Sequence, residues 1–178
     1  MRRDAGLFDV SHMRVVDVEG AGAREFLRFA LANDVARLAT PGKALYSCLL
    51  NDSAGVIDDL IAYFFRDDFF RLVVNAGTAD KDIAWLRTQI AARAPALKLT
   101  PRADLAIIAV QGPGARAALP QALPAAGAAV ASLKPFNAAI VIMPPDKEAE
   151  VIAAVSSRWP MVLAFQLRKT LETAADLF

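Results

Sequence analysis

The sequence predicts an α+β protein made mainly of antiparallel sheets with flanking helices. Three observations support this fold class. Apolar, strand-forming runs follow one another across short turn signals between residues 44 and 77. Segments with helical spacing of apolar residues lie on either side of these runs, at 22–34 and 78–95. Hydrophobic residues make up 56% of the 178-residue chain, which is enough for one good core or two small cores packed together.

The first half of the chain predicts a strand, a helix and three further strands. The segment 14–20 has strand composition, and the helix expected at 22–34 follows it directly. The three strands after residue 44 are separated by turn signals at 51–55 and 66–68. Because short connections of this kind join antiparallel neighbours, we expect a meander.

A second helix is predicted at 78–95. Thr78 is its expected N-cap residue, because a threonine hydroxyl commonly accepts a hydrogen bond from the first helical turn. Acidic side chains follow in the first turns, where they interact favourably with the helix dipole. Ile83, Leu86 and Ile90 recur on one face, so the helix is amphipathic.

The second half of the chain predicts strands at 97–102 and 105–113, and the latter is apolar enough to be buried on both faces. A strand at 137–145 and a helix at 146–159 are expected next. The last stretch, 161–178, is another helix candidate that ends on an apolar residue without a polar tail. We therefore expect that a following part of the protein is absent from this chain.

The composition argues against several classes of function. Twenty basic and nineteen acidic residues give a net charge of +1 without a charged block, so no nucleic-acid or membrane partner is expected. The single cysteine, Cys48, cannot form an internal disulfide, and the single histidine gives little support to a zinc cluster. No apolar run approaches the roughly 20 residues of a membrane span, and the stretch MRRDAGLFDV lacks the long apolar core of a signal peptide. These features predict a cytoplasmic protein.

Two adjacent carboxylates, Asp58 and Asp59, lie within the otherwise apolar strand segment 55–65. Adjacent strand side chains point to opposite faces, so the two acids should occupy different environments, one of them in or beside a core. An ionised carboxylate in an apolar setting is costly unless it is paired, hydrogen-bonded or used. The pair indicates either an acid that caps backbone amides or a single general base or cation partner. A glycosidase pair is disfavoured, because the side chains diverge instead of facing each other across a sugar.

Other polar motifs have ordinary structural interpretations. Ser11 and His12 beside Asp9 cannot form a catalytic triad, because its members must converge from separate elements. We interpret His12 as a hydrogen-bonded residue near a strand start. The glycine turn at 111–114 precedes a short helix that could receive an anion, but without the complete glycine fingerprint a plain turn is favoured.

Met13, Tyr46 and Phe136 are residue types that line ring-binding pockets. Such residues on strands more often belong simply to the core. The residue types alone therefore leave both interpretations open.

Five stretches taken together resemble the aminomethyltransferase, or T-protein, family of the glycine cleavage system. They are, in order, DAGLFDVSHM, FLRFALANDVARL, GKALYSCLLNDSAGVIDDLI, FFRLVVNAGTADKDIAWL and LAIIAVQGP. The match runs almost continuously from Arg3 to about Gly114, and SLKPFNAA at 132–139 resembles the segment expected next. The resemblance implies that the chain is part of the T-protein folate-binding fold.

The resemblance also implies an activity. Members of the family take an aminomethyl group from the lipoyl arm of the H-protein, release ammonia and form methylene-tetrahydrofolate. Tetrahydrofolate is thus the implied cofactor, and lipoylated H-protein the implied partner. The family's catalytic aspartate corresponds to Asp58, which would polarise the pterin N5 side or accept a proton there. Met13, Tyr46 and Asn75 match positions that line the folate pocket, and Asp59 would face the other way in a structural role.

The chain departs from the family pattern in three places. It begins inside the first matching stretch, and the family's last domain is absent. An Arg-Thr-Gly-Tyr-Thr-Gly-Glu loop, whose acid binds the pterin, is missing after residue 139. In LRKTLETAADLF, Arg168 is the implied counterpart of a substrate-binding arginine. We therefore expect a partial first domain at 1–50 with an N-terminal strand and helix, an incomplete ferredoxin-like α+β region at 51–178, and no C-terminal barrel.

Two hypotheses follow. The first is a shortened aminomethyltransferase with Asp58 as its catalytic residue. The second is a non-catalytic folate-binding or scaffolding relative, like the small subunit of heterotetrameric sarcosine oxidases. The missing loop and last domain motivate the second hypothesis.

Overall fold

The computed structural model describes residues 6–113, 129–133, 138–143, 146 and 149. Backbone contacts divide the chain into two compact units. One comprises Met1–Ser11 and Asp104–Phe178, and the other comprises His12–Ala103. The domain boundary expected between residues 50 and 51 falls inside the second unit, between two strands that pair with each other. Strand pairing thus joins the end of the expected first domain to the start of the expected second one.

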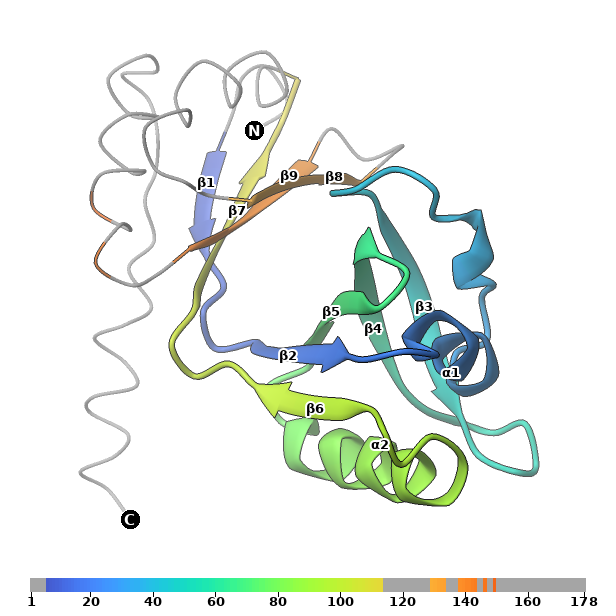
Figure 1. The fold of residues 1–178 in the computed structure, drawn as a ribbon. Helices are drawn as coiled ribbons and strands as arrows, with labels where there is room; N and C mark the ends of the chain where they lie inside the picture. Colours follow the sequence, from blue (N-terminus) through green and yellow to red (C-terminus); the bar gives the residue numbers. More distant parts are fainter. Residues whose placement is uncertain (1–5, 114–128, 134–137, 144–145, 147–148, 150–178) are drawn as a thin grey trace. The chain divides into compact units, whose positions relative to one another are not determined.

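The unit His12–Ala103 is built on a five-stranded sheet in the order β3-β4-β5-β2-β6 (Figure 1). Its strands are β2 (Arg14–Glu19), β3 (Ala44–Leu50), β4 (Val56–Arg66), β5 (Phe69–Val74) and β6 (Lys98–Pro101). All neighbouring strands are antiparallel. Strands β3, β4 and β5 form the predicted meander, and β2 and then β6 extend it beyond β5. The predicted α+β class with mainly antiparallel pairing is confirmed.

The helices α1 (Ala23–Ala30) and α2 (Ala79–Arg93) share one core with this sheet. Leu27 of α1, Leu86 of α2 and Leu72 of β5 are each fully buried in that core. The apolar face predicted for α2 is part of it. Full burial of one such side chain contributes about 1.5–3 kcal/mol relative to exposure, so the shared core accounts for the attachment of both helices.

Helix α1 ends at Ala30, before residue 34 where the predicted helix ends. The chain turns there to pair with β3, and the backbone N–H of Ala32 donates to the carbonyl of Cys48 at 2.9 Å. Asp34 then begins the short 3-10 helix η1 (Val35–Arg37), with its side chain accepting a backbone N–H of that helix. The bond from Ala32 to β3 and the local cap by Asp34 replace the last helical turn that the local pattern favours.

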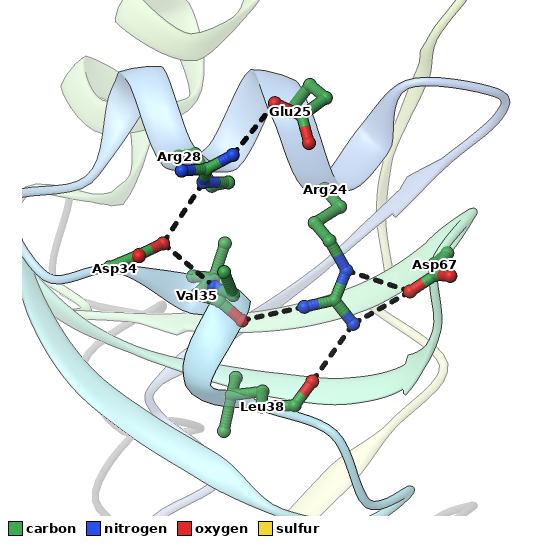
Figure 2. Close-up of polar contacts among 8 residues, drawn as sticks. Arg24, Glu25, Arg28, Asp34, Val35, Leu38 and Asp67 are labelled. Carbon is green, nitrogen blue, oxygen red and sulfur yellow. Dashed lines mark hydrogen bonds and ion pairs between the residues drawn. The ribbon is translucent and has the colours of Figure 1, made fainter.

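Arg24 of α1 ties together α1, η1 and the turn between β4 and β5 (Figure 2). Its guanidinium donates to the carbonyls of Val35 at 3.0 Å and Leu38 at 2.9 Å. It also forms an ion pair with Asp67 in the turn, at 2.7 Å. The guanidinium carbon lies 4.7 Å from the ring centre of Phe64, within cation–π distance. One side chain thereby adds a second donor to the Val35 carbonyl, which already accepts the N–H of Leu38, and supplies a donor to the carbonyl of Leu38 just after η1.

The other unit contains a four-stranded antiparallel sheet in the order β1-β7-β9-β8 (Figure 1). Its strands are β1 (Gly6–Asp9), β7 (Ala106–Gln111), β8 (Ala129–Leu133) and β9 (Ala138–Met143). Residues 106–110 of β7 are all buried, as predicted for that apolar strand. The helices expected at 146–159 and 161–178 lie outside the described residues, apart from Asp146 and Ala149. Within the described part of the chain, no helix combines the length and apolarity needed to cross a membrane.

Candidate active site

Asp58 lies on β4 opposite Leu49 of β3, and three neutral donors converge on its carboxylate. The backbone N–H of Asp59 donates to Oδ1 at 2.8 Å, and Nδ2 of Asn75 donates to the same oxygen at 2.9 Å. The hydroxyl of Thr78 donates to Oδ2. Asn75 directly follows β5 and Thr78 directly precedes α2, so the connection between these elements carries both side-chain donors to β4.

The donors determine the charge of Asp58. The hydrogen bond from Thr78 has the largest effect and holds the pKa of Asp58 well below its usual range, although partial burial acts in the opposite direction. The donors from Asp59 and Asn75 lower this pKa further. Because hydrogen bonds to the ionised form stabilise it, Asp58 is an anion at neutral pH. Such a carboxylate is a weak base but a strong fixed negative charge.

Asn75 links the two neighbouring acids. Its Nδ2 donates at 2.9 Å to Asp58 and at 2.9 Å to Oδ1 of Asp59, and it lies 3.2 Å from the backbone carbonyl of Asp59. The remaining donors to the two acids differ. The hydroxyl of Thr78 donates to Asp58, whereas the hydroxyl of Tyr46 donates to Asp59. The two carboxylates therefore have separate hydroxyl partners but converge on one amide donor, so they share part of one environment, contrary to the expectation from strand alternation.

Tyr46 lies on β3, and its hydroxyl donates to Oδ2 of Asp59. Its side chain is 56% exposed, so the ring is fixed at one end while much of its surface faces solvent. The bond to Asp59 is the main cause that raises the pKa of Tyr46 to about 12. Tyr46 is thus a neutral, exposed ring held by the second acid of the pair.

Asp82, on the first turn of α2, is the acid of this region that the sequence interpretation left out. Its side chain is 0% exposed, and neither carboxylate oxygen has a hydrogen-bond partner among the residues that the structure describes. Burial raises the pKa of Asp82 to about 6, and the proximity of the Asp58 carboxylate acts in the same direction, against smaller opposing effects of Thr78 and Lys81. The sequence spacing could have indicated the burial of Asp82, because it lies one helical turn before Leu86 on the apolar face of α2.

Thr78 was predicted only as the N-cap of α2. It occupies that position, but its side chain makes no capping hydrogen bond to the helix. The hydroxyl donates to Asp58 on the neighbouring strand instead. The side chain of Thr78 therefore belongs to the candidate site and does not cap the helix.

The other sequence candidates make none of these hydrogen bonds or lie outside the described residues. Met13 is half-buried just before β2, where Arg14 pairs with Val74, so Met13 lies next to Asn75 in the strand register, and Arg168 and Phe136 lie outside the described residues. His12 is exposed. Ser11 serves the backbone: its hydroxyl accepts from the N–H of Ile107 at 3.0 Å and lies 3.3 Å from the carbonyl of the same residue.

Comparison with known proteins places the chain in a family. The model of the GCVT N-terminal domain matches residues 1–140. An aminomethyltransferase from Burkholderia multivorans is 60% identical over 145 residues, which cover 82% of this chain and 39% of that relative. This chain thus spans less than half the length of that relative.

Comparison with solved structures leads to the same family. The glycine cleavage system aminomethyltransferase T from Bartonella henselae has 31% identity and a TM-score of 0.76, over 92% of this chain and 48% of that one. A chain of the heterotetrameric sarcosine oxidase from Corynebacterium sp. U-96, with 13% identity and a TM-score of 0.55, covers 88% of this chain and 86% of that one. The latter likeness concerns the fold alone. On the family match and these similarities, the chain belongs to the GCVT family of glycine cleavage T-proteins.

Proposed function

We propose that this chain supplies the catalytic carboxylate and part of the folate-binding surface of a glycine cleavage aminomethyltransferase. One observation carries the proposal. Asp58 is held as an anion by three neutral donors at the position of the family's catalytic acid. The donors are neutral, so the full negative charge of Asp58 remains available to a bound group.

The residues around Asp58 suit a flat, nitrogen-rich ring. Tyr46 offers an exposed aromatic surface, and Asp58 offers an acceptor for a ring N–H. Asn75 and Asp59 hold these two side chains in place, which reduces the freedom lost when a ligand binds. When bound, tetrahydrofolate would supply the nitrogens that receive the methylene carbon. Met13 and Arg168 complete the proposed folate contacts.

The charge state of Asp58 favours one of its two possible roles. A carboxylate with so low a pKa is a poor proton acceptor, since efficient general bases have a pKa near the working pH. Its fixed negative charge instead stabilises positive charge that develops on a nearby nitrogen. At about 4 Å and an effective dielectric constant of about 20, that attraction is about 4 kcal/mol. We therefore assign Asp58 a polarising role.

Lipoylated H-protein is the proposed donor of the aminomethyl group, and the cytoplasm is the proposed location. A free Cys48 agrees with a reducing compartment. The second candidate is a non-catalytic folate-binding or scaffolding relative. It is favoured by the sequence around residue 139, where strand β9 continues without the pterin-binding loop of the family.

The substitution Asp58→Asn tests the proposal. We expect it to lower aminomethyl transfer from lipoylated H-protein on the order of 10³-fold, because about 4 kcal/mol of charge stabilisation is lost. Tetrahydrofolate binding by calorimetry, on the same samples, should weaken as well. Asp52→Asn, in the exposed turn before β4, is the control and should change neither measurement.

The outcomes separate the two candidates. Folate binding without any transfer by the unmodified chain would favour the non-catalytic relative. Unchanged folate binding in Asp58→Asn, together with no transfer by the unmodified chain, would remove the enzyme assignment.

A further inference from the structure

Two carboxyl groups with opposite surroundings meet where α2 begins. Asp58 on β4 accepts three hydrogen bonds. Asp82 on α2 accepts none among the described residues, although it is completely buried. Its backbone N–H donates to the carbonyl of Thr78 at 3.0 Å, which places Asp82 one turn after the residue that binds Asp58. Thr78 therefore contacts both acidic residues: its hydroxyl donates to the carboxylate of Asp58, and its carbonyl accepts the backbone N–H of Asp82.

The burial of Asp82 requires an explanation. An ionised carboxylate without donors in the interior is costly, and a second negative charge nearby adds to that cost. The only cation paired with it within the described residues is Lys81, whose Nζ lies 4.0 Å from Oδ1. That Nζ is itself hydrogen-bonded to the carbonyl of Ile57 at 2.9 Å, and the lysine side chain is half exposed. It therefore offsets a negative charge on Asp82 only weakly. Protonation of Asp82 removes both the cost of burying its charge and the repulsion by Asp58.

We propose that Asp82 is a positioning residue that acts through Asp58: the two form one coupled carboxyl pair in which, as the pH falls, Asp82 takes up the proton while Asp58 keeps its charge. This inference rests on the proposed function of Asp58. Pairs of acids in different surroundings divide acid and base roles in this way, since donors stabilise one ion and burial penalises the other. Below about pH 6 the proton on Asp82 keeps the pair at a single negative charge, and at neutral pH most molecules carry both charges.

The electrostatics of the pair point the same way. Burial, followed by the proximity of Asp58, raises the pKa of Asp82 to about 6, whereas donation from Thr78 lowers that of Asp58. Asp58 and Lys81 are the ionisable groups that act on Asp82. As the pH rises through about 6, the pair gains its second negative charge. The electrostatic potential that the pair produces at the proposed folate site should change over the same pH range.

Carbon-detected magnetic resonance of the full chain with labelled aspartate carboxyl groups tests the pair without any ligand. We expect one aspartate to titrate with a midpoint near pH 6, and the resonance of Asp58 to show an inflection at the same pH. Both features should vanish in Asp82→Asn and persist in Asp80→Asn, an exposed acid on the same helical turn. Absence of the high midpoint, or its survival in Asp82→Asn, overturns the proposal.

A second variant covers the case in which Asp82→Asn does not fold. In Asp58→Asn the neighbouring charge is gone, so the midpoint of Asp82 should fall by about one pH unit. An unshifted midpoint shows that the two groups are not coupled and overturns the proposal.

Calorimetry with tetrahydrofolate then links the pair to the site. Affinity of the unmodified chain should change through about pH 6, and Asp82→Asn should flatten that dependence. If the coupled titration is present but folate does not bind, the proposed function fails and the pair stands. If folate binds with the same pH dependence in Asp82→Asn, the positioning role is overturned and the proposed function stands.

Discussion

The charge of Asp58 is controlled by donors that carry no charge of their own. A salt bridge would also lower its pKa, but it would neutralise the site and occupy the carboxylate with a cation. The amide of Asn75, the hydroxyl of Thr78 and the backbone N–H of Asp59 lower the pKa and leave the net charge in place. At the scale of single residues, this is what makes the site suitable for stabilising positive charge.

Removal of the Thr78 hydroxyl should destabilise the protein in a pH-dependent way. Asp58 has a folded-state pKa below its unfolded value, so its contribution to stability is present above about pH 4 and is lost as the pH falls. A hydrogen bond to a charged group contributes about 1.5–3 kcal/mol, so Thr78→Val should lose that much stability near neutral pH and less in acid. Urea unfolding at both pH values measures the difference.

Thr88→Val is the matched control for this prediction. The Thr88 hydroxyl bonds to the carbonyl of Ala84 within the same helix at 3.0 Å, on an exposed position. Its removal should change stability little and equally at both pH values. A Thr78→Val effect that does not depend on pH would contradict the assignment of this hydroxyl to Asp58.

The titration of Tyr46 reports on Asp59. In the folded protein the bond to Asp59 raises the pKa of Tyr46 to about 12. The substitution Asp59→Asn should move this pKa toward the usual value of about 10. Ultraviolet absorbance of tyrosinate follows it, in a Tyr63→Phe background that removes the only other tyrosine. An unchanged titration in Asp59→Asn would show that Asp59 does not hold the ring.

At the scale of elements, a short helix and a turn are held by side chains as well as by their own backbones. The 3-10 helix η1 has only three residues, and α1 stops where the chain begins to pair with β3. Arg24 supplies donors to both Val35 and Leu38 at this junction (Figure 2). The arginine is 19% exposed, so its bonds to the two carbonyls are partly shielded from solvent, whereas its ion-pair partner Asp67 is exposed.

Two arginines on α1, Arg24 and Arg28, should therefore differ in their contribution to stability. Arg24→Met should lower the free energy of unfolding by about 2 kcal/mol, because buried carbonyls lose charged donors. Arg28→Met should stay within about 0.5 kcal/mol, because the ion pairs of Arg28 with Glu25 and Asp34 are exposed. Chemical denaturation of both variants tests the contrast, and equal effects would mean that the Arg24 bonds add nothing to an ordinary surface pair.

At the scale of the whole molecule, the candidate site belongs to a single unit. Asp58, Asn75, Thr78 and Asp82 all lie within His12–Ala103, as do all members of the core beneath the five-stranded sheet. The local order of the site therefore depends on one compact unit of the chain.

A fragment of residues 12–103 should fold on its own. Its sheet, both helices and their common core are internal to this segment. We expect cooperative denaturant unfolding by circular dichroism, and an aspartate that titrates near pH 6 as in the full chain. Gradual unfolding without a cooperative transition would show that the segment needs the other unit.

Sequence patterns predicted the elements that depend on local periodicity. The meander β3-β4-β5 follows from apolar runs between turn signals, and α2 follows from its apolar face. The end of α1 was wrong, because bonds from Ala32 to β3 override the local helical pattern. Strands β1 and β8 were not expected, since short runs such as the Ala-rich residues 129–133 carry little signal of their own.

The sequence by itself determined the antiparallel α+β class, the family and the choice of Asp58, since periodicity and motif order are written along the chain. Only the tertiary structure decided what surrounds that carboxylate. Thr78 lies 20 positions away in sequence and donates to it, and Asp82 is buried nearby without donors. Charge states depend on burial and on partners brought together by folding, and neither property is encoded by a residue's immediate neighbours.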